Sequence, residues 1–287
     1  MLFRSRIWSA SSGRQLGMLS EPGHGPLWSA AFSPDGAEIV TASVDGTARI
    51  WSASSGRQLG VLSEPGNGSL YGAAFSPDGK EIVTASADGT ARVWSASSDQ
   101  QLGVLSEPRH DPLYSAAFSP DGKKIVTASD DGTARIWSAS SDQQLGVLAE
   151  SGFYGLYSAA FSPDGAEIVT ASADGTARIW SASSGRQLGV LSEPGFGILY
   201  SAAFSPDGSE IVTASHDGTA RIWSASSDQQ LTVLTQPGNT PLWSAAFSPD
   251  GKQVVTAGDD GTARIWSTEL AGPLRAIEQI AAIRLAR

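Results

Sequence analysis

The chain has no cysteine among its 287 residues, which excludes a disulfide framework and thiol chemistry. Its histidines, His24, His110 and His216, do not have the spacing of metal ligands. Only 17% of the residues are charged, and Asp plus Glu outnumber Lys plus Arg by 29 to 19. No patch of Lys and Arg is present to contact phosphates. We therefore expect no nucleic-acid partner, no metal and no cofactor.

Long apolar runs are also missing. The start of the chain, MLFRSRIWSA, lacks the apolar core of a secretory signal. No stretch approaches the about 20 apolar residues that a membrane-spanning helix needs. We therefore predict a cytoplasmic protein with no membrane partner.

Catalytic patterns are equally scarce. No Gly-x-Ser-x-Gly elbow occurs. Asp35, Asp45 and their copies lie in turn sequences, where Asp hydrogen-bonds the backbone of the turn. The DGK sequence from Asp78 to Lys80 is that of a hairpin turn and not of a phosphate loop. Because the features of an active site are missing, we predict that the chain is not an enzyme.

What the sequence has in abundance is repetition. The segments FSPDG and DGTAR each occur six times with a period of 43 residues. This period falls in the range of propeller blades and solenoid units. Tryptophan recurs with the same step, at Trp8, Trp51, Trp94, Trp137, Trp180, Trp223 and Trp266.

Each repeat predicts four short strands, here named a, b, c and d. Between Pro26 and Ser63 the runs LWSAAFS, EIVTAS, TARIWS and RQLGVLS are separated by Pro-Asp-Gly, Asp-Gly and Ser/Gly-rich sequences. Asp-Gly tolerates the positive φ of tight hairpins, and the runs are rich in β-branched and aromatic residues. Phe32, Ile39, Trp51 and their copies are expected to pack between neighbouring sheets. The repeat is therefore a four-stranded antiparallel sheet.

The segment LYSAAFSPDGKKIVTASDDGTARIWS, from Leu113 to Ser138, resembles the repeats of the WD40 β-propeller family. The similarity extends from Arg6 to Ser267. It implies an all-β propeller domain over residues 1–272, in which strand a lines a central channel. The b–c and d–a loops would then share one face, called the upper face.

Two features depart from the family pattern. Trp-Ser replaces the dipeptide that names the family, and the Gly-His before strand a is mostly lost. The family's buried hydrogen-bond chain from Trp through Ser or Thr and His to Asp is thus expected to be cut short. Trp51, Thr41 and Asp45 would keep part of it, and the d–a loops would be loosened.

The ends of the chain leave the blade count open. Six full a–b–c sets follow an N-terminal c–d pair from Phe3 to Ser20. The resemblance implies that the N-terminus donates a strand to the last sheet. The pair is then either half of a seventh blade, which we favour, or the closure of a six-bladed ring with a surplus strand. Leu274 follows Trp266 at the spacing of a strand d of the last unit.

The tail, residues 273–287, begins with Pro and is rich in helix formers. We predict a short helix packed at the seam, with IAAI as an alternative strand. Because the blade count is open, we expect either a monomer or a homo-oligomer in which the chains complete the ring together.

The nearly identical repeats differ in sequence at two places, just before strand a and at the residue before each Asp-Gly. The resemblance places both on the upper face, whereas the varying a–b turns, with Lys80 and Lys123, form ordinary solvated surface on the lower face. Drift of unconstrained loops explains the variation as well as a recognition surface does. The recognition interpretation predicts these partner-binding residues: Trp28, Tyr71, Tyr114, Tyr157, Tyr200, Trp243, Phe153, Tyr154, Phe196, Asp130, His216 and Asp259.

The predicted function is a non-enzymatic scaffold that binds a protein or peptide through the upper face. One alternative is a multivalent glycan-binding propeller, and another is a module of a larger signalling protein without an independent role. A sugar site needs the same polar neighbours beside every aromatic ring. Here the neighbours differ from copy to copy, which favours one asymmetric partner.

Overall fold

The computed structural model describes residues 3–21, 25–65, 68–149, 152, 154–193, 195, 197–268 and 283–284. All regular elements in these ranges are β-strands. The chain divides into two compact units, Met1–Ala149 and Glu150–Arg287, which are described separately.

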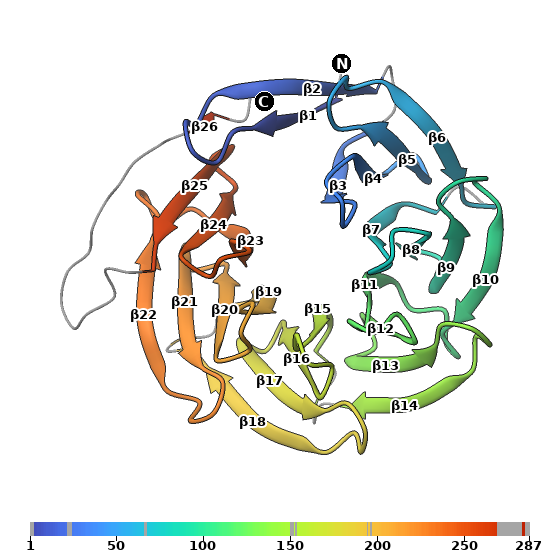
Figure 1. Cartoon of the computed structure of the whole chain (residues 1–287). Coiled ribbons are helices and arrows are strands. Elements are labelled where there is room, and N and C mark those ends of the chain that lie inside the picture. Colours follow the sequence, from blue (N-terminus) through green and yellow to red (C-terminus); the bar gives the residue numbers. More distant parts are fainter. Residues whose placement is uncertain are drawn as a thin grey trace. The chain divides into compact units, whose positions relative to one another are not determined.

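Unit 1 contains a two-stranded sheet followed by three four-stranded antiparallel sheets (Figure 1). The two-stranded sheet consists of β1 (Phe3–Trp8) and β2 (Gln15–Glu21). The remaining strands are β3 (Leu27–Phe32), β4 (Glu38–Ser43), β5 (Thr47–Ser52), β6 (Gln58–Ser63), β7 (Leu70–Phe75), β8 (Glu81–Ser86), β9 (Thr90–Ser95), β10 (Gln101–Ser106), β11 (Leu113–Phe118), β12 (Lys124–Ser129), β13 (Thr133–Ser138) and β14 (Gln144–Ala149).

Unit 2 contains three more sheets of the same kind in its described residues. Their strands pair in chain order, as in unit 1. The strands are β15 (Leu156–Phe161), β16 (Glu167–Ser172), β17 (Thr176–Ser181), β18 (Gln187–Ser192), β19 (Leu199–Phe204), β20 (Glu210–Ser215), β21 (Thr219–Ser224), β22 (Gln230–Thr235), β23 (Leu242–Phe247), β24 (Gln253–Gly258), β25 (Thr262–Ser267) and β26 (Ile283–Arg284).

Turn chemistry sets where each strand ends. In the a–b turn after β11, the Ser119 hydroxyl donates to Asp121 Oδ1 at 2.6 Å, and Gly122 adopts a φ of 70°. In the b–c turn, the Thr133 backbone N–H donates to Asp131 Oδ1 at 2.9 Å, and Gly132 has a φ of 80°. Glycine accepts these left-handed conformations without steric cost. The predicted four-stranded antiparallel repeats are therefore confirmed.

The core lies between consecutive sheets within each unit. One face of the β3–β6 sheet presents Val40, Ile50 and Leu62 to Leu70 and Trp94 of the next sheet, and all five are buried. The same residue types pack between the other neighbouring sheets within each unit. As expected, Ile39 and Trp51 pack between sheets, and so do their copies Ile82, Trp94, Ile125, Trp137, Ile211 and Trp223.

Phe32 differs from its copies because 57% of its surface is exposed. Phe75 and Phe118 instead pack against the buried clusters. The first strands of consecutive sheets lie side by side, so that Figure 1 shows β7 between β3 and β11, and β19 between β15 and β23.

The N-terminal c–d pair is present, and among the described residues its strands form a two-stranded sheet of their own instead of the fourth strand of the last sheet that the resemblance implied. β2 pairs with β1, with Trp8 opposite Gln15. The short c–d turn makes this local pairing the one with the lowest entropy cost. Leu19 and Ile7 of the pair pack against Ile39 and Trp51.

The last sheet takes its fourth strand from the tail. Thr262 and Ala263 of β25 pair with Arg284 and Ile283 of β26. These two tail residues are therefore extended and not helical. The rest of the predicted helix, and the expected strand around Leu274, lie outside the described residues.

Candidate functional site

Ten of the twelve predicted partner-binding residues fall within the described residues, whereas Phe153 and Phe196 lie outside them. The six strand-a aromatics occupy the second position of their strands, and the other described residues lie in loops and turns. In every four-stranded sheet, strand a begins where strand b ends, as Leu113 pairs with Ser129. The d–a loop and the b–c turn therefore share one end of each sheet, here called the aromatic end.

Backbone hydrogen bonds join the two variable positions at the aromatic end. The N–H of Asp130 donates to the carbonyl oxygen of Pro112 at 2.9 Å, two residues before Tyr114. The N–H of Asp259 donates in the same way to Pro241 at 2.9 Å, two residues before Trp243. Equivalent bonds of 2.9 to 3.0 Å occur in the other four sheets. The residue before each Asp-Gly is thus held beside the aromatic ring of its own sheet.

The aromatic row of unit 1 consists of Trp28, Tyr71 and Tyr114. The ring centroids of Trp28 and Tyr71 are 5.9 Å apart with an edge-on geometry. Tyr71 and Tyr114 are 5.2 Å apart and tilted by 51°. Such edge and tilted contacts suit the charge distribution of aromatic rings. The three rings form a continuous apolar surface, and 54% of Trp28 is exposed.

The aromatic row of unit 2 consists of Tyr157, Tyr200 and Trp243. Tyr200 lies 5.3 Å from Tyr157 and 4.4 Å from Trp243, measured between ring centroids. The imidazole of His216 is a third neighbour of Tyr200, at 6.2 Å. Tyr154, in the preceding d–a loop, is also exposed.

Each row has a carboxylate at its third ring. The hydroxyl of Tyr114 donates to Asp130 Oδ1 at 3.2 Å in unit 1. The indole N–H of Trp243 points at Asp259 Oδ1 at 3.4 Å in unit 2. Partial burial raises the pKa of the Tyr200 hydroxyl, and the nearby Tyr157 and Asp259 raise it further. The aromatic ends therefore combine exposed rings with exposed negative charge.

A buried polar network supports the d–a loops under this surface. The indole N–H of Trp94 donates to Thr84 Oγ1 at 3.0 Å, and the Thr84 hydroxyl donates to Glu64 Oε1 at 3.0 Å. Glu64 also forms a buried ion pair with Arg92, whose other terminal nitrogen lies 3.0 Å from Asp88 Oδ2. The network thus runs from Trp through Thr, Glu and Arg to Asp.

Two further copies of this network are present among the described residues. Glu107 pairs with Arg135, and Glu193 pairs with Arg221. Burial raises the pKa of the Glu193 carboxyl, while Arg221 and the hydrogen bonds that Glu193 accepts oppose that shift. A buried carboxylate is tolerated because each of these glutamates has a guanidinium partner.

The expectation that loss of the family histidine cuts the network short is wrong at these three glutamates, whereas the expected loosening of the d–a loops stays a prediction. Glu takes the place of His, and Arg of the DGTAR segment bridges it to Asp. Neither role was predicted from the sequence. The sequence signal for these roles is that Glu in SEP and Arg in DGTAR recur at a fixed spacing. Charged side chains are almost never fully buried unless they are paired, so this recurrence indicates buried ion pairs.

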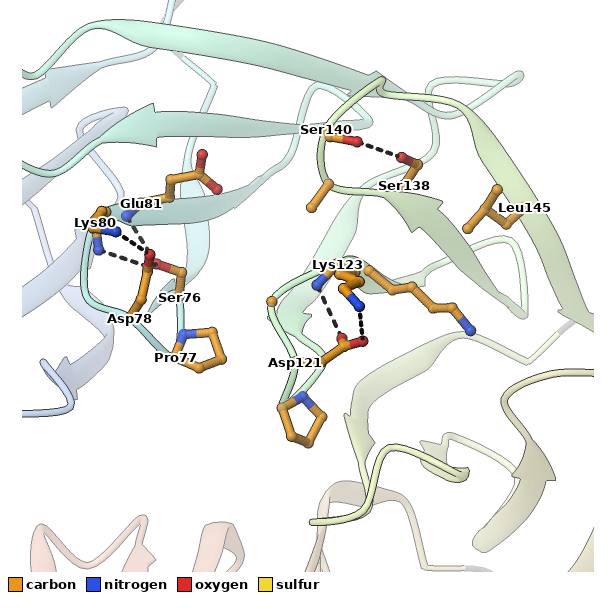
Figure 2. Close-up of a pocket in the computed structure, with 14 residues that line it drawn as sticks. Ser76, Pro77, Asp78, Lys80, Glu81, Asp121, Lys123, Ser138, Ser140 and Leu145 are labelled. Carbon is orange, nitrogen blue, oxygen red and sulfur yellow. Dashed lines mark hydrogen bonds and ion pairs between the residues drawn. The ribbon is translucent and has the colours of Figure 1, made fainter.

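The opposite ends of the sheets carry the a–b turns. A cavity of about 750 Å³ lies between two of them in unit 1, with Leu145 at its rim (Figure 2). Two of its three lysines face carboxylates of their own turns, Lys80 at 3.1 Å from Asp78 and Lys123 at 3.8 Å from Asp121. A similar cavity of about 570 Å³ recurs in unit 2 without lysines. The repetition marks these cavities as grooves between adjacent repeats. Lysines and carboxylates line the groove of unit 1 together, whereas the carboxylates of Asp164, Glu167 and Asp207 line that of unit 2 without a lysine.

Within the described part of the chain, no group of His, Asp and Glu side chains is arranged to hold a metal ion. The same residues contain no helix that could cross a bilayer. The recurring Asp side chains accept hydrogen bonds from turn backbones, as at Asp131.

The repeat geometry agrees with a match to one family of known proteins. The family model described as WD domain, G-beta repeat matches residues 13–52, 56–95, 100–138, 143–181, 185–224 and 229–267. These segments together cover more than half of the chain. The chain belongs to the WD40 family. Its members are generally scaffolds for protein interactions and typically have no enzymatic activity. No curated protein matches the chain.

Proposed function

We propose that this WD40 protein is a non-enzymatic scaffold that binds a protein or peptide partner through the aromatic ends of its sheets. One observation carries the proposal. Each unit exposes a row of three touching aromatic rings that the core does not use. Aromatic side chains bury large areas on binding at a low entropy cost, and they dominate the energetics of protein interfaces.

The surroundings of the rings favour an asymmetric partner. The residue held beside each ring is Val44, Ala87 or Asp130 in unit 1 and Ala173, His216 or Asp259 in unit 2. A repeated sugar site would need the same hydrogen-bonding groups at each ring. A protein surface supplies different groups to different sheets, and the variable residues fit that requirement.

Affinity capture from cell extract with the intact chain as bait tests the proposal. Tyr71→Ala and Tyr200→Ala should each weaken capture of the partner by about 2 kcal/mol or more, the threshold of an interface hot spot. Lys80→Ala and Lys252→Ala, at the a–b turns, are the matched controls and should retain the partner.

Retention by the tyrosine variants with loss in the lysine variants would reject the proposal. Release of the captured proteins by a free monosaccharide would point to glycan binding instead. The melting temperature of each variant shows whether a loss of capture reflects unfolding.

A further inference from the structure

The most crowded aromatic cluster among the described residues surrounds Tyr200. Its ring contacts Tyr157, Trp243 and His216 at centroid distances of 5.3, 4.4 and 6.2 Å. The rings meet edge-on or tilted, and 44% of Trp243 is exposed. The cluster therefore presents one open indole surface at its end, next to the exposed Asp259.

The electrostatics around Trp243 are one-sided. No Lys or Arg occurs among the described d–a loop and b–c turn residues of unit 2. The nearest arginines in sequence, Arg221 and Arg264, are each tied to an aspartate of their own turn, at 2.9 and 3.0 Å. Asp259 is therefore a carboxylate with no Lys or Arg neighbour on these described turns. A cation from a partner would be attracted to this position.

The ring geometry selects among possible cations. A quaternary or methylated ammonium group binds inside a cage, between rings that are held apart. Here the rings contact one another, which leaves no space between Tyr200 and Trp243. A planar guanidinium can instead stack on the open indole surface and bind a carboxylate with two parallel N–H groups. The site thus suits arginine better than lysine or methylated lysine.

We propose that Trp243 and Asp259 form a subsite for an arginine side chain of a peptide partner. This inference rests on the proposed function, because it names the chemistry that the aromatic end of unit 2 recognises. The guanidinium stacks on the Trp243 indole and pairs with the Asp259 carboxylate. Tyr200 holds the indole in place from the other side.

Unit 1 contains a parallel arrangement. Its third ring, Tyr114, donates to Asp130 as Trp243 does to Asp259, and both aspartates are exposed. The nearby d–a loop of unit 1 carries the exposed Arg109, which lowers the attraction for a second cation, and Asp111, which offsets part of that effect. Unit 2 is therefore the stronger site.

Fluorescence anisotropy with a labelled Gly-Ser-Arg-Gly-Ser-Arg-Gly-Ser peptide tests the inference on the full chain. Replacing both arginines with citrulline, which has nearly the same shape but no charge, should weaken binding at least tenfold. Replacing them with lysine should weaken it at least threefold. Added salt should also weaken binding of the arginine peptide, because the pair is exposed to solvent.

Two variants with the same change of charge locate the site. Asp259→Asn keeps the acceptor for the Trp243 N–H and removes the negative charge, so it should weaken binding at least fivefold. Glu210→Gln removes one negative charge at the start of β20, the end of that strand remote from His216, and should leave the affinity unchanged.

Equal binding of the arginine and citrulline peptides would overturn the inference, as would an unchanged affinity of Asp259→Asn. Absence of binding at about 1 mM, the weak end of measurable peptide affinities, would also overturn it. The proposed function fails separately. If Tyr200→Ala abolishes capture of a partner whose binding does not depend on arginine, the scaffold proposal stands and the arginine subsite is rejected.

Discussion

Gly60 of β6 lies directly against the carboxylate of Asp99, which belongs to the neighbouring sheet. A Cβ atom added to Gly60 would be 2.7 Å from Asp99 Oδ2. That oxygen accepts a hydrogen bond from the backbone N–H of Val61 at 3.3 Å. Asp99 reaches it from a φ of 57°, in the left-handed region that Asp tolerates better than most residues. The aspartate thus covers the outer edge of the preceding sheet, where backbone groups would otherwise be free to pair with another chain.

Gly60→Ala should displace the Asp99 carboxylate and break this bond, with a loss of about 1 kcal/mol of unfolding free energy. The matched control is Gly146→Ala, where the nearest atom, Ile136 Cδ1, lies at an ordinary contact distance of 3.8 Å. The control should change stability by less than about 0.5 kcal/mol. Urea denaturation of both variants measures the difference, and equal losses would contradict the role of Asp99.

Glu107→Gln should destabilise the fold by about 3 kcal/mol, because it removes the charge that pairs with the buried Arg135. The shape of the side chain is kept, so the loss reports on the charge. Glu81→Gln, at the partly exposed start of β8, is the control and should have little effect. Thermal unfolding followed by tryptophan fluorescence measures both variants. A Glu107→Gln variant as stable as the parent would show that the ion pair adds nothing to stability.

Leu19→Ala should cost about 2 to 5 kcal/mol, since Leu19 is buried against Ile39 and Trp51. Leu16 lies on the same strand but is 57% exposed, and Leu16→Ala should cost less than about 0.5 kcal/mol. The comparison tests whether the N-terminal strand pair is part of the folded unit. Similar midpoints for the two variants in urea would show that it is not.

The pKa of the Asp78 carboxyl lies at about 2 because the Ser76 hydroxyl and the Lys80 backbone N–H donate to it. The ordinary value is about 3.9. A pKa that is lower in the folded chain favours folding above about pH 4, and this contribution is lost as the pH falls towards 2. Ser76→Ala should raise the pKa of Asp78 towards its ordinary value, as measured by carboxyl carbon NMR. Asp164, whose pKa is lowered by Ser162, should not change in that variant. An unchanged Asp78 would show that the hydroxyl does not set its pKa.

The strands were predictable because their signals are local. Pro-Asp-Gly marks each a–b reversal and Asp-Gly each b–c reversal, and the turn aspartates form the hydrogen bonds that such sequences imply. The family resemblance added the common location of the d–a loops and b–c turns. It could not specify which of these loop residues touch, because ring contacts such as Tyr200 with Trp243 depend on the spacing between sheets.

The network of Glu107 with Arg135 was not predictable by comparison with the family pattern, because it replaces that pattern with different chemistry. The pairing of β25 with β26 was not predictable from the sequence for another reason. The tail has the composition of a helix, and tertiary pairing overrides such local propensity. Both cases involve partners that are distant in sequence.

The near identity of the repeats has a consequence for how the chain folds. Strand b reads EIVTAS in four sheets, strand c reads TARIWS in five, and the two pair in the same register each time. Side-chain contacts therefore do not distinguish the pairing of a strand b with the strand c of its own repeat from its pairing with the strand c of another repeat. The distinction comes from chain connectivity, since only three residues separate Ser172 from Thr176. Pairing a strand b with the strand c of the next repeat would close a longer loop, which costs about 2 kcal/mol more in entropy. At high concentration a strand from another molecule competes on nearly equal terms, so refolding yield should fall steeply with protein concentration through exchange of whole hairpins between chains.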